Sequence, residues 1–320
     1  MKQYITRRLL EMIPVLIGIS ILIFAIFQLA PGDPVSTMVD PKASAAAKAK
    51  LREQMHLNEP MLVQYKYWAT DILKGNWGES FYFKQPVKKV INSYIWNSFY
   101  LSLASFLLSA ALSIPIGVLS ATRQYSKFDY IFTVFALIGI SMPSFFFGLL
   151  LIKWFAVDIK LFPVSGMTVP GSTATGFALF QDVMHHMTLP LVVLTLGSLA
   201  GLMRYTRSSM LEVIRQDYIR TARAKGLREK VVIYKHGLRN ALIPVVTIFG
   251  MSLPGLFSGA IITEQIFNWP GIGPIGLQAV NTRDYTLLMG INMLLAALTL
   301  LGNLIADITY ALVDPRIRFK

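Results

Sequence analysis

Six long stretches without a charged residue constrain this chain more than any other feature of its sequence. A helix needs about 20 residues to cross a hydrocarbon core about 30 Å thick. A mean hydropathy of +0.53 and a charged fraction of only 15% agree with such crossings. The six expected spans are Ile13–Ala30, Phe99–Leu119, Tyr130–Ile152, Met187–Met203, Asn240–Thr263 and Tyr285–Ala306. The sequence therefore predicts an all-α polytopic membrane protein with six transmembrane helices.

The first stretch also has one property of a secretory signal, because Lys2, Arg7 and Arg8 precede it. Its apolar part is too long for a signal peptide, and Ala30–Pro34 offers no small-x-small cleavage site. We therefore expect the first stretch to be retained as a span.

The basic residues indicate how the spans are oriented. The net charge is +13, and more than half of the 30 Lys and Arg residues lie on the side of the membrane that holds both termini. Loops longer than about 60 residues are largely exempt from the positive-inside rule, which removes the first external loop from the comparison. The rule then predicts that both termini are cytoplasmic.

Few segments are long enough to fold outside the lipid. We expect four regions: residues 1–30, the N-terminus and first span; 31–98, an extracytoplasmic subdomain; 99–310, a five-helix core with the cytoplasmic loop 204–239; and 311–320, a cytoplasmic tail. Within the external subdomain, Ala43–His56 and Met61–Leu73 read as surface helices, followed by a turn at Gly75–Gly78. The segment Phe162–Gly176 is too rich in Gly and Pro for regular structure.

The cytoplasmic loop Arg204–Arg239 holds ten Lys and Arg residues against three acids. Its pattern predicts a helix to Gln216, an N-cap at Asp217, a short helix over Tyr218–Lys225 and a left-handed residue at Gly226. Helix then resumes toward the fifth span. The loop is therefore expected to form a protruding knob.

Three roles are open for this knob. Its charges can attract anionic lipid at about 1 kcal/mol per basic residue. Nucleic acid is disfavoured, because no groove-reading or base-stacking module is visible. Docking of a cytosolic partner fits better, since headgroup attraction requires neither Gly226 nor the apolar residues between the charges, which are Ile219, Ala222, Ala224 and Leu227.

The knob also carries a resemblance. Asp217–Leu227 followed by His236–Pro244 resembles the coupling segment of ABC-importer permeases, in the variant of the dipeptide/oligopeptide/nickel branch. Fragments of the same pattern occur along nearly the whole chain, at Pro31–Pro34, Ser141–Pro143, Phe162–Gly166, Arg207–Leu211, Glu264–Phe267, Trp269–Gly273 and Asp314–Arg318. The general family pattern Glu-Ala-Ala-x-x-x-Gly is altered here, because Arg220-Thr221-Ala222 precedes Gly226. The long first external loop resembles that of the first of two permease subunits.

The resemblance implies a type I importer permease fold and a subunit that moves di- or oligopeptides across the cytoplasmic membrane of a prokaryote by alternating access. Nickel chelates or another small solute are the alternative cargo, and a non-transporting membrane scaffold is the alternative role. The implied partners are a second homologous permease, two cytosolic ATP-binding subunits, an extracytoplasmic solute-binding protein and membrane lipid. ATP and Mg are expected on the ATPases, with no cofactor on this chain, which has no Gly-x-x-x-x-Gly-Lys-Ser/Thr motif. The implied coupling residues are Asp217, Tyr218, Ile219, Arg220, Thr221, Ala222, Arg223, Ala224, Lys225, Gly226 and Leu227.

Polar residues inside the spans are candidates for the translocation path. Serines recur on one stripe of the second stretch, where they suit either close helix packing or a polar wall. Asn303 and Asp307, four residues apart in the sixth stretch, either line the path or cap a helix contact. The candidate path residues are Ser102, Ser105, Ser109, Ser113 and Asn303.

Other kinds of site find little support. With no cysteine, no clustered acids and no Ser/His/Asp set, we expect no catalytic residues and no metal site, although His185-His186 are adjacent. No stretch carries the mid-membrane ionisable group that a secondary transporter needs, nor the catalytic pair of an intramembrane enzyme. Gly271–Gly276 matches a dinucleotide motif but contains Pro274 and follows no strand, so a re-entrant turn is expected. Kinks are expected at Pro143, Pro244 and Pro254.

Overall fold

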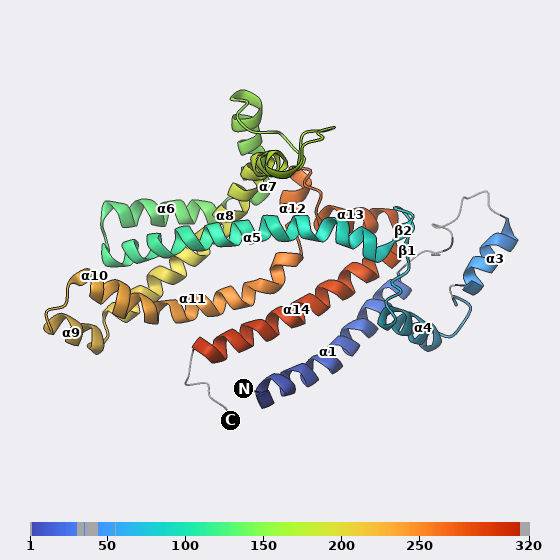
Figure 1. The fold of residues 1–320 in the computed structure, drawn as a ribbon, viewed down its shortest axis with the longest axis horizontal. Coiled ribbons are helices and arrows are strands. Elements are labelled where there is room, and N and C mark those ends of the chain that lie inside the picture. Colours follow the sequence, from blue (N-terminus) through green and yellow to red (C-terminus); the bar gives the residue numbers. More distant parts are fainter. Residues whose placement is uncertain (1, 31–34, 36–43, 55, 314–320) are drawn as a thin grey trace.

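The computed structural model describes residues 2–30, 35, 44–54 and 56–313, and these are mainly helical (Figure 1). The long helices are α1 (Lys2–Gln28), α5 (Val87–Thr122), α8 (Gly176–Ile214) and α14 (Tyr285–Val313), and α11 (Leu238–Ser252) lies within a longer helical span, Glu229–Phe257. The shorter helices are α3 (Ala45–Gln54), α4 (Met61–Leu73), α6 (Lys127–Ser141), α7 (Ser144–Leu151), α9 (Asp217–Ala224), α10 (Glu229–Val231), α12 (Ile261–Ile266) and α13 (Ile272–Thr282). Two π-helical segments, η1 (Ile152–Asp158) and η2 (Val232–Gly237), and one 3₁₀ segment, η3 (Leu253–Phe257), complete the helical elements. The motifs at Pro31–Pro34 and Asp314–Arg318 lie outside the described residues.

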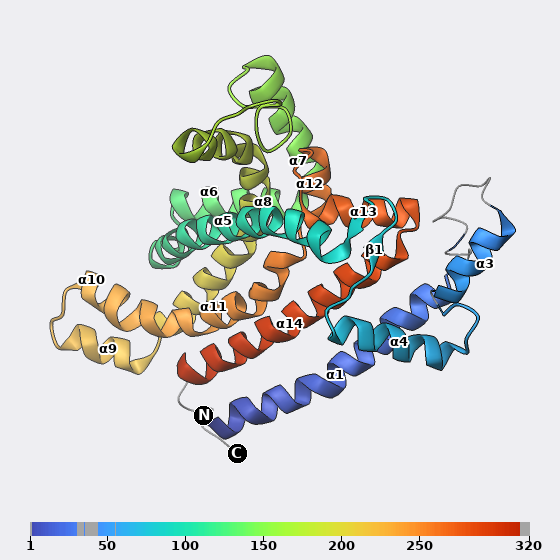
Figure 2. The same cartoon turned by 45° about the vertical axis from the view of Figure 1, so that its right-hand side comes forward.

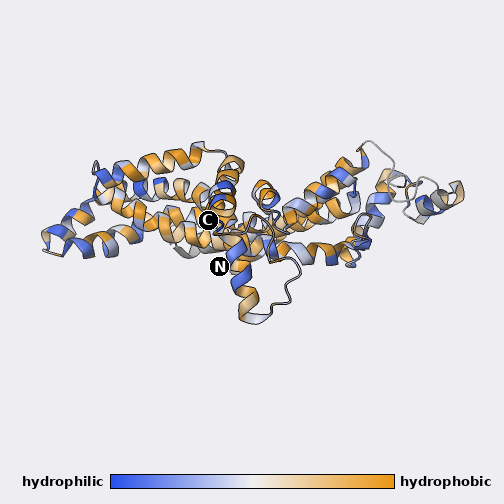
Figure 3. Cartoon of the chain, turned by 90° about the horizontal axis from the view of Figure 1, so that it is seen from above, coloured by the Kyte–Doolittle hydropathy of each residue, from blue (hydrophilic) through white to orange (hydrophobic). Residues whose placement is uncertain are grey.

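The long helices have the length and composition of membrane spans. In the described ranges, five helices are long and apolar enough to cross a membrane, and a bent helix pair supplies a sixth crossing if it counts as one. Hydrophobic residues predominate along the long helices, whereas the end of the molecule that holds α9 and α10 is mainly hydrophilic (Figure 3). Large apolar side chains on the spans are exposed, among them Leu22, Ile26 and Ile131, each more than 60%. Such a surface requires lipid or another membrane subunit to cover it.

The two ends of the long helices carry different elements. α1 lies beside α14, and Arg8 Nε near the start of α1 lies 3.3 Å from Asp307 Oδ2 near the end of α14 (Figures 1 and 2). The knob formed by α9 and α10 lies at one end of the long helices, and α3, α4 and a short hairpin of strands β1 (Glu79–Ser80) and β2 (Gln85–Pro86) lie at the other (Figures 1 and 2).

The expected third span is not one straight helix. α6 and the α7–η1 segment meet at 105°. The residue before the break, Met142, is extended with φ −81° and ψ 123°, because a following proline disfavours helical backbone. Pro143 thus does more than kink the helix: it ends α6 and starts α7 in a new direction.

The fifth expected span also ends earlier than the hydrophobic run predicts. The helical crossing runs from Glu229 to Phe257, and the last residues of the run belong to a loop and to α12. Pro244 remains inside α11, whereas Pro254 lies in the 3₁₀ segment where the α-helix stops. A proline lacks the N–H that the helix needs, which explains the termination.

In the region 31–98, α4 has the expected bounds, and α3 lies within the expected first surface helix. This region also contains the hairpin of β1 and β2, whose strands are too short for sequence periodicity to reveal. The buried carboxylate of Asp284 accepts hydrogen bonds from Ser80 Oγ, from Tyr82 N at 3.2 Å and from Leu287 N at 3.1 Å. Asp284 therefore fastens the hairpin to the start of α14.

The most extensive helix contact joins α5 and α8. This contact is tightest at Gly117 of α5, where an added Cβ atom would lie 2.7 Å from Thr206 Cβ and 2.9 Å from Met203 O of α8. Only a residue without a side chain allows the two backbones to approach this closely.

We expect Gly117→Leu to lower the free energy of unfolding by about 1–3 kcal/mol, because the added side chain forces α5 and α8 apart. Thermal unfolding of the purified protein in detergent measures the change. Gly18→Leu in α1 is the matched control, since no atom lies within 4 Å of the Cβ position of Gly18. An unchanged melting temperature for Gly117→Leu would contradict the close contact.

Candidate functional site

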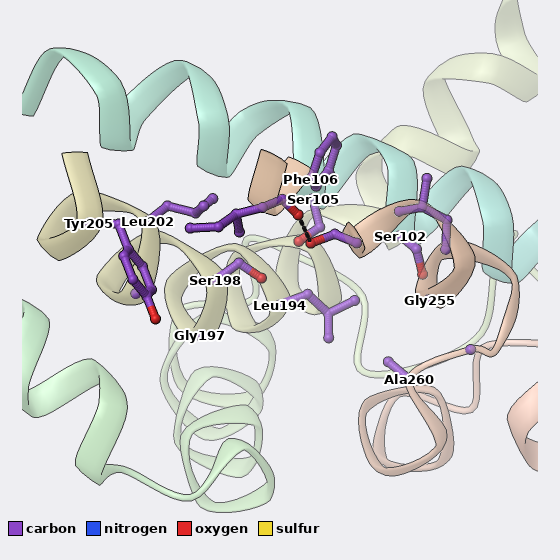
Figure 4. A pocket seen from close by; sticks show the side chains of 15 residues that line it. Ser102, Ser105, Phe106, Leu194, Gly197, Ser198, Leu202, Tyr205, Gly255 and Ala260 are labelled. Atoms are coloured by element: carbon purple, nitrogen blue, oxygen red, sulfur yellow. Dashed lines mark hydrogen bonds between the residues drawn. The ribbon is translucent and has the colours of Figure 1, made fainter. Parts of the chain in front are cut away.

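A cavity of about 430 Å³ lies between α5, α8 and the α11–η3 segment. Its lining consists of Ser102, Ser105, Phe106, Leu194, Gly197, Ser198, Gly201, Leu202, Tyr205, Ile248, Ser252, Gly255, Leu256, Gly259 and Ala260. None of these side chains is charged. The labelled residues of α5 and α8 gather around the space in Figure 4.

Small residues and free hydroxyls characterise this cavity. Four of its lining residues are glycines, which leave room for a molecule between the helices. Within the described part of the chain, the hydroxyls of Ser102 and Ser198 have no hydrogen-bond partner. The wall can therefore offer hydroxyl groups to the amides of a passing molecule without binding a charge.

The structure separates the candidate path residues into two groups. Ser102 and Ser105 line the cavity. Ser109 and Ser113 lie outside it, fully buried, and their hydroxyls donate to carbonyls of their own helix, at 2.9 Å to Phe106 O and 3.4 Å to Ala110 O. Asn303 is exposed on α14 and also lies outside the cavity. Of the alternatives for the serine stripe, packing thus fits the half that holds Ser109 and Ser113, and a path wall fits the half that holds Ser102 and Ser105.

Sequence reasoning missed the contribution of α8 to this cavity. Gly197, Ser198 and Gly201 supply its wall, and Gly255 and Gly259 supply the opposite side. The cluster of small residues in the fourth and fifth hydrophobic runs was the available signal.

A buried acid holds the end of the cavity nearest the hairpin. Glu264 Oε1 accepts from Ala260 N at 3.2 Å, and Oε2 accepts from Gly273 N at 3.0 Å. Ser98 Oγ also bonds to this carboxyl group and accepts from Ile272 N at 2.8 Å. Burial raises the pKa of Glu264 above its ordinary value, and these hydrogen bonds offset only part of that increase. The expected turn at Gly271–Gly276 is therefore the start of α13, fixed through Glu264 to α5.

The knob has the expected helix–turn–helix shape. α9 spans Asp217–Ala224, and Gly226 has φ +74°, the left-handed conformation predicted for it. The predicted N-cap was wrong by one residue: Gln216 precedes the helix, and the Asp217 side chain makes no capping bond because Asp217 is already helical. After the turn the chain passes through α10 and the π-helical η2 into α11.

The apolar residues of the knob divide between its inside and its outside. Ile219 and Ala222, three residues apart, are buried against Val232 and Val213. Ala224 and Leu227 are exposed, as are the remaining residues of the coupling segment. Ile219 and Ala222 thus attach the knob to the core, and only the others are available to a partner.

An exposed ion pair closes the turn. Arg223 Nη2 donates to Glu229 Oε1 at 2.7 Å and Arg223 Nε to Oε2 at 3.2 Å, across Gly226. These bonds raise the pKa of Arg223. The pair orients the turn but, being exposed, adds little stability.

A buried ion pair behind the knob was not anticipated. Asp129 in α6 accepts two bonds from Arg207 in α8, both at 2.9 Å, one from Ser120 Oγ at 2.7 Å and one from Tyr125 N at 3.0 Å. Pairing across 78 residues cannot be read from one sequence. The cluster ties α5, α6 and α8 together one turn or two before α8 reaches the knob.

The adjacent histidines are each bonded within the protein. His185 Nε2 lies 2.9 Å from Leu161 O, and His186 Nδ1 lies 3.1 Å from Asp182 Oδ1. Across the described residues, no group of three His, Cys, Asp or Glu side chains is placed to hold a metal.

Comparison with known proteins gives matches along the whole chain. Residues 113–319 match the family model described as binding-protein-dependent transport system inner membrane component, and residues 1–94 match the model of the N-terminal part of such membrane components.

Curated relatives are similar over their full length. The oligopeptide transport system permease protein AppB of Bacillus subtilis is 48% identical over 320 residues, covering 100% of both chains. The dipeptide transport system permease protein DppB of Escherichia coli K12 is 40% identical, again over 100% of both. A putative peptide permease protein of Brucella suis is 42% identical over 99% of both.

Among solved structures, the inward-facing MetNI methionine ABC transporter has a chain of similar fold. The TM-score is 0.53 at 20% identity, covering 71% of this chain and 97% of that one. At this identity the match supports the fold alone, and it confirms the type I importer permease architecture expected from the sequence.

Proposed function

We propose a peptide-import function on one premise: the chain belongs to the family of binding-protein-dependent transport system inner membrane components. As a member it is a multi-pass permease subunit of an ABC importer, and it is not an enzyme. Its proposed cargo is di- or oligopeptides, because the relatives that match its full length are named as oligopeptide and dipeptide permeases.

The observation that carries the proposal is the uncharged cavity bounded by Ser102, Ser198 and several glycines. Peptides of different sequence share only their backbone amides, to which hydroxyl groups can donate and from which they can accept. A path that recognised charged side chains would select among peptides, whereas this lining does not. Nickel chelates remain the second candidate cargo within the same family.

The subunit arrangement is also part of the proposal. A second homologous permease covers part of the exposed apolar surface, two cytosolic ATPases that bind ATP and Mg dock on the knobs, and an extracytoplasmic binding protein delivers cargo. The chain then lies in the cytoplasmic membrane with the termini and the knob in the cytoplasm, in agreement with the excess of basic residues there. Closure of the ATPases moves the knobs and switches the cavity between the two sides.

Affinity purification in mild detergent followed by reconstitution tests this function. A second six-span protein and P-loop ATPases should elute with the chain, and proteoliposomes holding the complex and its binding protein should take up labelled dipeptides or oligopeptides when ATP is supplied. Elution of the chain alone, or uptake of nickel chelates without competition from peptides, would overturn the peptide proposal.

We expect Gly201→Trp to reduce peptide uptake at least about tenfold, because the indole ring occupies the cavity while the Cβ position itself has no neighbour within 4 Å. Ser109→Ala is the matched control. Ser109 was also predicted as a path residue but lies outside the cavity, so uptake by this variant should stay within about twofold of the unchanged protein. Initial uptake rates at equal protein content measure both. Full uptake by Gly201→Trp would show that cargo passes elsewhere.

A further inference from the structure

A second cavity, of about 720 Å³, lies at the end of the molecule opposite the knob, and the proposed transport function does not use it. It is enclosed by α1, α4, the hairpin and the start of α14. Phe24 and Phe27 come from the last turns of α1, and Tyr285 and Met289 come from the first turns of α14. Since α1 ends and α14 begins at one face of the membrane, the cavity sits where hydrocarbon meets headgroups.

The walls of this cavity are fixed by contacts between the span and the external subdomain. Gln28 Nε2 donates to Gln64 Oε1 at 2.9 Å, and Gln64 Nε2 donates to Glu59 O at 2.8 Å. The rings of Phe24 and Trp68 lie 5.6 Å apart, and those of Phe27 and Tyr285 lie 5.8 Å apart. The cavity is therefore a built feature with an apolar, largely aromatic floor.

The rim of the cavity carries charges without partners. Asp71, Glu79 and Lys84 all line it, and within the described part of the chain none of them forms an ion pair. Lys88 lies beside the cavity as well, with its Nζ 5.7 Å from the ring centroid of the lining residue Trp77. Two carboxylates and two ammonium groups around one cavity suit a headgroup that carries both a positive and a negative charge. Carboxylates beside aromatic faces favour a cation, through charge and through the ring quadrupole.

We propose that this cavity binds a phospholipid with a primary ammonium in its headgroup, of the phosphatidylethanolamine type, from the leaflet opposite the knob. The ammonium pairs with Asp71 and Glu79, the phosphate pairs with Lys84, and the upper acyl chains lie against Phe24, Phe27 and Met289. The volume falls within the range of about 300–1,000 Å³ that is usual for small-molecule sites.

A lipid fits this position better than a soluble amine or a peptide. A soluble amine or a peptide could pair with the charged residues of the rim, but neither requires an apolar floor made by membrane-spanning helices. The neighbouring turns of α1 also expose Leu22 and Ile26, by 62% and 63%, so acyl chains leaving the cavity continue along an apolar surface. Bound lipid would join the peripheral helix α1 to α14 and to the external subdomain.

Native mass spectrometry of the purified complex tests the proposal. After delipidation, the complex is mixed with phosphatidylethanolamine, phosphatidylglycerol or phosphatidylcholine of identical chains, or with glycerophosphoethanolamine, which has no chains. One phosphatidylethanolamine per copy of this permease should be retained at least about fivefold better than the other three. The variant Asp71→Asn with Glu79→Gln should lower that retention about tenfold, whereas Glu212→Gln with Asp158→Asn, which removes two exposed acids outside the cavity, should leave it unchanged.

Four outcomes would overturn the proposal. Equal retention in the Asp71/Glu79 variant would separate the lipid from this cavity, and preference for phosphatidylglycerol would reverse the assigned headgroup chemistry. Equal binding of glycerophosphoethanolamine, or displacement of lipid by a dipeptide, would assign the site to a soluble ligand. Met289→Trp, which fills the floor and keeps the rim, should also lower retention, so the test does not depend on the folding of one variant.

Discussion

Replacement of Gly226 by valine is expected to lower ATP-driven uptake about tenfold while the chain still inserts and the partner ATPases still hydrolyse ATP. The φ of +74° costs a residue with a Cβ atom roughly 1–2 kcal/mol, and a β-branched residue more. No atom lies within 4 Å of the Cβ position, so the loss is one of conformation and not of space. Valine therefore shifts the turn between α9 and α10 away from the shape that an ATPase would contact.

Gly226→Asn is the matched control, because asparagine tolerates the left-handed region far better than valine. Uptake and ATP hydrolysis are measured together in proteoliposomes at equal expression. The asparagine variant should keep most of the uptake. Normal uptake by Gly226→Val would refute the role of the turn in coupling, whereas loss of both activities in the asparagine variant would indicate that side-chain bulk at the contact is the cause.

Removal of the buried carboxylate in Asp129→Ala is expected to destabilise the protein by about 3 kcal/mol, because the partly buried Arg207 charge, Ser120 and Tyr125 N lose their acceptor together. Thermal unfolding of the complex and its yield measure the effect. Arg207→Gln should cost a similar amount, and the double variant should cost clearly less than the two single changes added, since the groups interact directly.

The Arg223–Glu229 pair is the control for burial. It has the same bidentate geometry, but its side chains are 41% and 55% exposed. Glu229→Gln should therefore cost no more than about 1 kcal/mol. Equal losses for Asp129→Ala and Glu229→Gln, or additive effects of Asp129→Ala and Arg207→Gln, would contradict a special role for the buried cluster.

The spans could be predicted from the sequence because a hydrophobic run and a membrane thickness are both one-dimensional quantities. The predictions that were wrong concerned the direction in which the chain continues after a proline. The run through Pro143 has the composition of one crossing, but the backbone at Met142 turns the second half by 105°. Likewise the run beyond Pro254 stays apolar while the chain leaves the span for α12.

In the candidate site, too, local conformations could be predicted from the sequence, whereas contacts between distant elements could not. Gly226 and the helix before it were predictable, because a local conformation follows from local residues. The inward orientation of Ile219 and Ala222 was not, since it depends on Val213 and Val232 packing from either side. The serine stripe could not be divided between packing and path before the position of α8 was known, and the Asp129–Arg207 pair joins elements that the sequence holds far apart.

The contact at Gly117 gives α8 the geometry of a lever. From Thr206 at this contact to the knob end at Ile214 is about 12 Å of helix, and from Thr206 back to Pro190 is about 24 Å, at 1.5 Å per residue. The residues of α8 that line the cavity, from Leu194 to Tyr205, all lie on the longer arm. A tilt of this part of α8 as a rigid rod about Gly117 would move Leu194, about 18 Å from Thr206, in the opposite direction to the knob end and about one and a half times as far. Ser198, about 12 Å from Thr206, would move about as far as the knob end, so that a push on the knob is carried across the contact into the wall of the cavity.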